Sequence, residues 1–491
     1  MTRLVKILNT FIGVGMISSI PICGFSQMKE KVLNQLKHDA QQHLETNFDL
    51  YKKAEQEIWN FSEVGYKEVK STDLLQSLLK QHGFEIDRGV AGIPTAFVAT
   101  YGTGKPVIGI LAEYDALPGL SQDTVPMKQA VADRMAGHGC GHNLFGVASV
   151  AAGIAIKKML TDGTFKGTIK VFGCPAEEGG SGKVYMVREG LFNDVDAVMH
   201  WHPSDKNNAS VSSSLANISA KFRFHGLSAH AAASPEKGRS ALDGVEAMNN
   251  MVNMMREHIP SSTRVHYVIT DGGKAPNVVP DFAEVYYYVR HVDPETVRSV
   301  FDRVINAANG AAMGTGTTVD YEITGGVYNL LGNITLSKQM YANLSLVGGV
   351  QYTHQEEDFA KKIQQSFANE KPAIQASHNI EPFVVLVNQA MGGSTDVADV
   401  SWTVPTVGMT AATWVPGTPA HSWQAVAASG MDIGAKGMMV AAKTMTATGI
   451  DLFTNPTLLQ EAKTEFIKAR GEGFQYTPLL GDRKPALNYR D

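Results

Sequence analysis

The sequence is poor in cysteine and has no excess of basic charge. Only three cysteines occur in its 491 residues, Cys23, Cys140 and Cys174. A disulfide framework of the kind that holds small exported domains together is therefore excluded. The 43 basic and 48 acidic residues give a net charge of -5, whereas a nucleic-acid-binding protein needs a basic excess to neutralise phosphates. We expect no nucleic-acid partner.

Long apolar runs are also scarce, and the clearest one lies near residue 1. Two basic residues precede a mostly apolar stretch, 7–22, and small residues follow it before Gln27. This pattern is typical of a cleaved signal peptide, since a membrane span needs roughly 20 apolar residues. We therefore expect residues 1–26 to be a signal peptide and the protein to be exported, with the bacterial periplasm as its compartment. A retained anchor is the alternative, and no later stretch is expected to cross a membrane.

The chain is long enough for two or three domains, and 44% of its residues are hydrophobic. Short apolar runs that end in polar clusters, such as 106–119 and 167–180, alternate with helical stretches. This alternation predicts an α/β domain with a mostly parallel, doubly wound sheet that is buried on both faces. Ligands of such sheets bind beyond the carboxyl ends of the strands, which is where the polar clusters occur.

The middle of the chain has a different pattern. Residues 217–327 read as strand, helix, two strands, helix and strand. This β-α-β-β-α-β order is the split arrangement of a small α+β domain. We expect this domain to be inserted into the larger one, whose two parts are then 27–216 and 328–491.

A cysteine and a histidine stand two residues apart in the sequence GHGCGHN (137–143). On an extended segment the side chains of Cys140 and His142 would point the same way, and the glycines beside them would let the backbone approach an ion. Thiolate and imidazole are good ligands for zinc and similar divalent metals. Taken alone, such a pair can equally well be structural.

Two adjacent carboxylates, Glu177 and Glu178, follow a buried apolar run in the sequence CPAEEGG. Burial of both would be unfavourable without compensation. One of them can bind a metal while the other, which points elsewhere, acts as a base. A solvated turn is the alternative for an isolated pair, and we expect Cys174 to be a packed thiol.

Further histidines occur in HWHP (200–203) and PAHSW (419–423). Only one of His200 and His202 needs to be a ligand. Four clusters, each after an apolar run, are hard to attribute to coincidence. Together they contain enough donors for two metals bridged by a water.

These clusters belong to a set of motifs that resembles the M20 metallopeptidases, in the same order, from about residue 59 to residue 453. The set is AEYDALPGL, GHGCGHN, GCPAEEGGSGKVYMVREG, WHP, GLSAHAAASPEKGRSALD, APNVVP and GTPAHSWQ. It is most similar to the amidohydrolase branch that contains indole-acetyl-amino-acid hydrolases and hippuricases. The resemblance implies two divalent metal ions, zinc or manganese, and a general base at Glu177. The implied metal ligands are Cys140, His142, Glu178, His202 and His421.

The same resemblance implies roles for residues that the sequence alone would assign to ordinary surface or turn positions. Asp115 would orient a metal ligand. The inserted domain would be a satellite domain through which two copies dimerise, and His230 would reach the partner's active site to stabilise the oxyanion. Asn277 and Arg290 would help to hold the substrate.

The implied reaction is hydrolysis of the amide bond of N-acyl or N-aroyl amino acids of the p-aminobenzoyl-glutamate kind. Metal-activated water would attack the carbonyl, with Glu177 as general base, and the guanidinium of Arg290 would suit a free carboxylate. The alternatives are a dipeptidase or carboxypeptidase with the same site, and a metal- or ligand-binding protein without catalysis. A zinc nucleobase deaminase is excluded because its Cys-x-x-Cys motif is missing. We expect a homodimer, and a second kind of subunit stays open.

Overall fold

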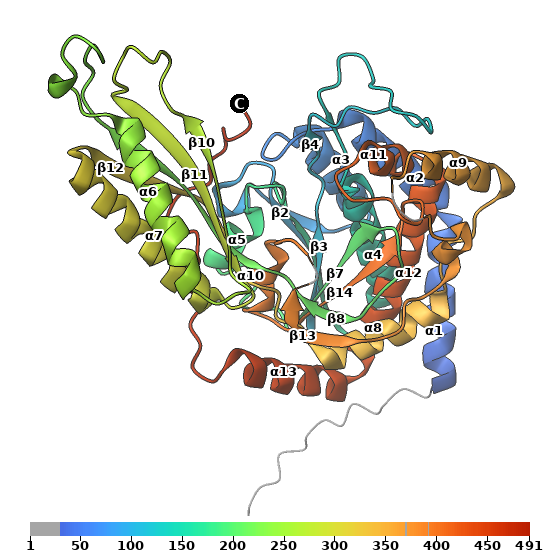
Figure 1. The fold of residues 1–491 in the computed structure, drawn as a ribbon. Helices are drawn as coiled ribbons and strands as arrows, with labels where there is room; N and C mark the ends of the chain where they lie inside the picture. The colour runs from blue at the N-terminus through green and yellow to red at the C-terminus, as the bar shows by residue number, and fades with distance from the viewer. Residues whose placement is uncertain (1–29, 369–370, 391) are drawn as a thin grey trace, which may run out of the picture.

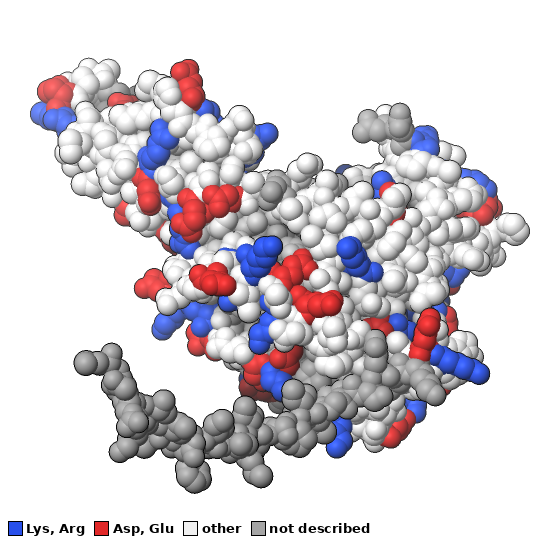
Figure 2. Space-filling view, turned by 90° about the horizontal axis from the view of Figure 1, so that it is seen from below, with Lys and Arg blue, Asp and Glu red and all other residues white. Residues whose placement is uncertain are grey.

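The computed structural model describes residues 30–368, 371–390 and 392–491. Figure 1 shows a larger α/β body from which a smaller domain projects. The expected signal peptide, residues 1–26, lies outside the described residues. On the described part of the face in Figure 2, acidic and basic side chains are interspersed and form no continuous basic stripe.

The larger body is built on a six-stranded sheet with the order β1-β2-β6-β3-β7-β14. Four of its strands are parallel neighbours, and β1 and β2 form an antiparallel edge. The strand bounds are β1 Glu85–Arg88, β2 Phe97–Thr103, β3 Val107–Ala112, β6 Gly167–Gly173, β7 Ala197–Ser204 and β14 Thr406–Ala412. All six residues of β3 are buried, as expected for a central strand covered on both faces. The predicted mostly parallel sheet is confirmed.

Helices cover both faces of this sheet (Figure 1). On one face α4 and α12 contact the strands directly, and α1, α2, α3 and α8 pack around them. On the other face α5 and α10 pack over β3, β6 and β7. The helix bounds are α1 Glu30–Thr46, α2 Phe48–Phe61, α3 Val69–Gln81, α4 His142–Thr161, α5 Gly182–Arg188, α8 Ile334–Val347, α9 His354–Gln365, α10 Val397–Ser401, α11 Trp423–Ser429, α12 Asp432–Thr454 and α13 Pro456–Arg470.

Helix α4 has the length and composition of a membrane span, so the expectation that no later stretch has this character is wrong by composition. Its most apolar 18-residue window has a mean hydropathy of 1.5. However, 78% of that window is buried inside the protein. A helix that is apolar all round and enclosed by neighbours is typical of the core of a large domain.

The smaller domain has the predicted β-α-β-β-α-β order. Its sheet is antiparallel with the order β10-β11-β9-β12, and α6 and α7 pack on one face. The bounds are β9 Ala216–His225, α6 Ala241–Met255, β10 Arg264–Asp271, β11 Phe282–His291, α7 Pro294–Thr315 and β12 Thr318–Val327. Local signals begin and end α7: Asp293 caps the Thr296 N–H at 2.9 Å, Pro294 opens the helix, and Gly316 ends it at φ 66°.

The carboxyl ends of the parallel strands bring the polar clusters together. Glu113 and Asp115 follow β3, residues 174–178 follow β6, and His202 lies near the end of β7. Because parallel strands end at the same edge of a sheet, three clusters from distant parts of the sequence become neighbours. Short additional strands complete the fold: β4 Leu117–Pro118 with β5 Ala136–Gly137, and β8 Val211–Ser213 with β13 Val385–Ala390.

Candidate metal centre

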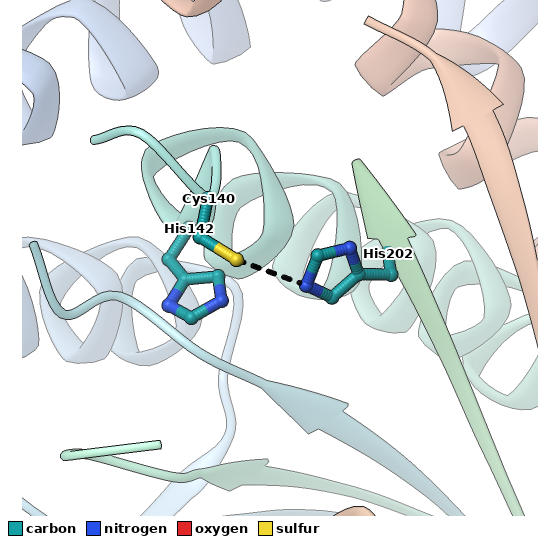
Figure 3. Close-up of side chains that lie close together, drawn as sticks. All are labelled: Cys140, His142 and His202. Atoms are coloured by element: carbon teal, nitrogen blue, oxygen red, sulfur yellow. Dashed lines mark hydrogen bonds between the residues drawn. The ribbon is translucent and has the colours of Figure 1, made fainter. Parts of the chain in front are cut away.

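Cys140 and His142 lie at the start of α4, where the chain turns sharply. Gly141 adopts φ 74° as the residue before the helix, and His142 is the first helical residue. The predicted extended segment is therefore wrong, and it is the left-handed turn that brings the two side chains together. A Cβ at Gly141 would lie 2.7 Å from the Pro203 side chain, so this glycine also lets the turn approach β7. The Cys140 Sγ is 3.3 Å from His202 Nε2 (Figure 3).

The two predicted histidine ligands near the sheet point one ring nitrogen towards the site. His202 Nδ1 lies 2.7 Å from the Pro203 carbonyl, and His142 Nδ1 lies 2.9 Å from Asp115 Oδ1. Each Nδ1–H is thus placed to donate, which leaves Nε2 free to act as a ligand. Burial, together with the nearby His142, lowers the pKa of His202 to about 4, so this imidazole is neutral at pH 7, as a metal ligand must be.

The loop after β6 carries Glu177 and Glu178. Ala176 adopts φ 57°, and its backbone N–H donates to the buried Glu68 carboxylate at 2.8 Å. The backbone N–H of Glu178 donates to Asp115 Oδ2 at 2.9 Å. These bonds direct the Glu178 carboxylate towards His421, whose Nε2 is 3.2 Å from Glu178 Oε1.

His421 comes from the loop between β14 and α11. It adopts φ 57°, and its backbone N–H donates to the Gly139 carbonyl at 2.9 Å. Its side chain is 52% exposed, so this side of the site is open to solvent. The hydrogen bond with Glu178 raises the pKa of His421 above its ordinary value.

Within the described residues, three groups place potential ligand atoms within 4.8 Å of one another: Cys140/His142/His202, Cys140/Glu178/His421 and Glu113/His142/Glu177. The first two groups contain all five residues predicted as ligands. His142 Nε2 and Glu178 Oε1 are buried and make no hydrogen bond of good geometry, although buried polar atoms are normally paired. Orphaned donor atoms in a thiol, imidazole and carboxylate set fit divalent cations.

Asp115 connects two of these groups, because one carboxylate oxygen holds His142 and the other holds the Glu178 backbone. We predict that Asp115→Asn weakens metal binding by about 10- to 100-fold, since an asparagine cannot accept both hydrogen bonds. Competition with a chelator of known affinity would measure the change. Asp162→Asn, which alters an exposed pair with Lys158, is the matched control, and an equal affinity in both variants would contradict the prediction.

A buried charge cluster next to the site was not predicted from the sequence. Lys183 Nζ lies 2.7 Å from Glu113 Oε1 and 2.7 Å from Asp396 Oδ1. All three side chains are at most 1% exposed. Burial lowers the pKa of Lys183, but the two carboxylates outweigh this and hold it above its ordinary value. The one signal for Glu113 was its position directly after an apolar strand, in a motif whose Asp115 received the attention.

Glu177 lies among other acidic groups. Burial, followed by the charges of Glu113 and Glu178, raises the pKa of its carboxyl well above the ordinary value. A general base works best with a pKa close to the working pH. A bound cation would act in the opposite direction on this pKa, so the environment suits a carboxylate that takes up and releases a proton.

The structure places His230, Asn277 and Arg290 in the smaller domain, outside the three ligand groups. His230 is exposed, and its Nδ1 accepts from the backbone N–H groups of Ala232 and Ala233 at 3.2 and 3.1 Å. Its Nε2 therefore carries the proton. Asn277 lies beside it, since its carbonyl accepts from the Ala231 N–H at 3.0 Å.

Arg290 stands on β11 with its guanidinium 5.0 Å from the centre of the Tyr288 ring. Its Nε is buried and has no hydrogen-bond partner among the described residues. The stacking holds the guanidinium in place, and the unpaired Nε leaves hydrogen-bonding capacity for a further group.

The comparisons with known proteins agree with this geometry. The Peptidase dimerisation domain family matches residues 216–314. One of the two kinds of chain of the p-aminobenzoyl-glutamate hydrolase from Escherichia coli (strain K12) is 42% identical over 446 residues, which cover 86% of this chain and 93% of that protein. The chain belongs to the M20 family. A second M20 relative, the Xaa-Arg dipeptidase of Mus musculus, is 28% identical and covers 83% of this chain and 87% of its own length.

Solved M20 structures share the fold. A Bacillus subtilis protein described as a dinuclear metal-binding peptidase of the M20 family has a TM-score of 0.57 at 17% identity, and the match covers 83% of this chain and 99% of that one. The expected class of enzyme, a metal-dependent amidohydrolase, is confirmed by these relatives. The individual site residues are assigned from their geometry.

Proposed function

We propose that this M20 protein hydrolyses the amide bond of N-acyl or N-aroyl amino acids, with p-aminobenzoyl-glutamate-like compounds as its best substrates. The observation that carries the proposal is the juxtaposition of Glu177 with a five-residue ligand set at the carboxyl ends of the strands. The 42% identity to a chain of p-aminobenzoyl-glutamate hydrolase supports the choice of substrate.

Cys140, His142, Glu178, His202 and His421 would hold two divalent ions, zinc or manganese, of which the thiolate favours zinc. When bound, such ions polarise the substrate carbonyl and lower the pKa of water from about 15.7 towards about 7. Glu177 accepts the proton of the attacking water and returns it to the leaving amine. The Nε2–H of His230 donates to the carbonyl oxygen, where negative charge develops. Arg290 pairs with the free carboxylate of the amino acid.

The substrate proposal is tested by metal analysis and a substrate panel. Purified protein would be assayed with p-aminobenzoyl-glutamate, hippurate and simple dipeptides, with zinc and with manganese. We expect p-aminobenzoyl-glutamate to have the highest kcat/KM and about two metals per chain in the active form. Metal-loaded protein that hydrolyses none of the three would contradict the proposal.

A dipeptidase is the second candidate, because a relative named Xaa-Arg dipeptidase matches most of the chain at 28% identity. The same panel separates the two functions. A kcat/KM for dipeptides above that for both aroyl substrates would favour this candidate.

We further propose a homodimer formed through the smaller domain, in which His230 of one protomer serves the site of the other. The match to a dimerisation domain and the exposed, tautomer-fixed His230 support this arrangement. We predict that Glu177→Gln and His230→Ala protomers, each inactive alone, regain roughly a quarter of wild-type activity when they are mixed and reassociated. Mixed variants that stay inactive would show that each chain uses its own His230, and a native mass that includes a second polypeptide would show a hetero-oligomer.

Export remains part of the proposal, on the pattern of residues 1–26. We expect mature protein to be recovered from the periplasmic fraction and to begin at Gln27. A chain that keeps residues 1–26 in the membrane fraction would indicate an anchor instead.

A further inference from the structure

A segment distant in sequence reaches the metal centre. Residues 477–491, which we call the strap, follow α13 and run between the two bodies to the position marked C in Figure 1. None of the motifs singled out in the sequence lies in this segment.

The strap is attached to the smaller domain at its start. The carbonyl of Thr477 accepts from Arg298 at 2.6 Å and from the Tyr328 hydroxyl at 2.8 Å. Arg483 donates to the Ile323 carbonyl and to Glu322 on β12. These contacts fix one end of the strap against α7 and β12.

Two adjacent leucines continue the strap into both cores. Leu479 is buried in the core of the smaller domain, whereas Leu480 is buried in the core under α5 of the larger domain. A Cβ at Gly326 would lie 2.5 Å from the Leu480 nitrogen, so the strap and β12 are in close backbone contact. The strap is therefore part of the folded interior at this point.

Helix α5, which directly follows the metal loop, holds the next part of the strap. Arg188 donates to the Arg483 carbonyl at 2.8 Å, and the Tyr185 hydroxyl donates to the Lys484 carbonyl at 3.3 Å. Backbone groups of the strap are thus bound by side chains of the element that continues from Glu177 and Glu178.

The last contacts are made on the metal loop itself. The Tyr489 hydroxyl donates to the Glu178 carbonyl at 3.1 Å, and Arg490 Nη2 donates to the same carbonyl at 2.6 Å. The Tyr489 ring packs edge-on against Tyr66 at 5.4 Å, whose hydroxyl donates to the Gly180 carbonyl at 2.7 Å. Lys67 and Asp491 form an ion pair at 2.7 Å.

These bonds complete the support of Glu178. Asp115 binds its backbone N–H, and the strap binds its backbone carbonyl, so both peptide groups beside the side chain are held. The loop has no regular secondary structure at this point, and its neighbour Gly179 adopts φ 93°. With no helix or strand ladder to fix the backbone, the direction of the Glu178 carboxylate depends on these individual hydrogen bonds.

We propose that Tyr489 and Arg490 are positioning residues that set the Glu178 carboxylate for metal binding. The inference rests on the proposed role of Glu178 as a metal ligand. Arg490 supplies a charge-assisted hydrogen bond, and Tyr489 supplies a second donor whose ring is packed against Tyr66.

The test is a metal titration of the Tyr489→Phe/Arg490→Ala double variant without substrate. We expect about tenfold more free metal to be needed for half occupancy, by analogy with other groups that orient metal ligands. With substrate, kcat should fall and KM should stay within about twofold, because neither side chain binds substrate. Arg490→Lys should restore part of the metal affinity, since it keeps a cationic donor.

Lys484→Ala is the matched control, because that side chain is exposed and the strap uses only its carbonyl. An unchanged metal affinity in the double variant would overturn the proposal, and so would an equal loss in Lys484→Ala. Should Arg490→Ala not fold, Tyr489→Phe removes one hydroxyl alone, and an unchanged affinity in it and in Arg490→Lys together would also overturn the proposal. Because the titration needs no substrate, it is decided separately from whether acyl amino acids are hydrolysed.

Discussion

Replacing Glu177 with glutamine is expected to lower kcat by roughly a thousandfold, while the protein keeps its metal. The amide retains the size of the side chain but cannot accept the proton of the attacking water. The buried position of Glu177, beside Glu113 and Glu178, leaves no exposed base to replace it. Steady-state assays and metal analysis of the same preparation would measure both effects.

The contrast with its neighbour makes this result specific. Glu178→Gln should lose metal and activity together, because the carboxylate that faces His421 is then neutral. Glu189→Gln changes an exposed residue near the end of α5 and should leave both properties unchanged. Loss of metal from Glu177→Gln would contradict the assignment and would make Glu177 a ligand, as its place in the third group with Glu113 and His142 allows.

Replacing Lys183 with methionine should destabilise the protein by about 3–5 kcal/mol. The buried ammonium lies between Glu113 and Asp396, at 2.7 Å from each carboxylate. Methionine keeps most of the volume but leaves two buried carboxyl groups without their cation. Urea unfolding of metal-free protein would measure the change, since bound metal would add its own stabilisation.

An exposed ion pair is the appropriate comparison. Lys158→Met removes a partner of Asp162 on the surface of α4 and should cost no more than about 1 kcal/mol. Asp396→Asn combined with Lys183→Met should recover part of the lost stability, because it removes one of the uncompensated charges. A Lys183→Met variant as stable as Lys158→Met would show that the cluster contributes nothing measurable.

The fold class was predictable because it depends on local patterns. The runs that formed β3, β6, β7 and β14 are buried on both faces, so nearly all their residues are apolar and the pattern is visible without a structure. The same holds for the smaller domain, where helical and alternating periods succeed one another. Helix α4 shows the limit of this approach, because composition does not separate a membrane span from a core helix.

The candidate ligands were predictable in part. Each follows an apolar run, and parallel strands bring such positions to one edge of the sheet. The reason why Cys140 and His142 converge was predicted wrongly, because the left-handed Gly141 turn replaces an extended segment. The sequence also left His200 and His202 equivalent, and the structure distinguishes them, since it is His202 Nε2 that lies beside Cys140.

The sequence by itself therefore determined the order of elements, the class of fold and the chemical types at the site. Only the tertiary structure decided which charges neutralise one another and which segments support the ligands. Lys183 and Asp396 are 213 residues apart, and Arg490 and Glu178 are 312 apart. Such pairs leave no periodic signal, because a single buried ion pair or hydrogen bond depends on where distant backbones meet and not on the residues beside it in the chain.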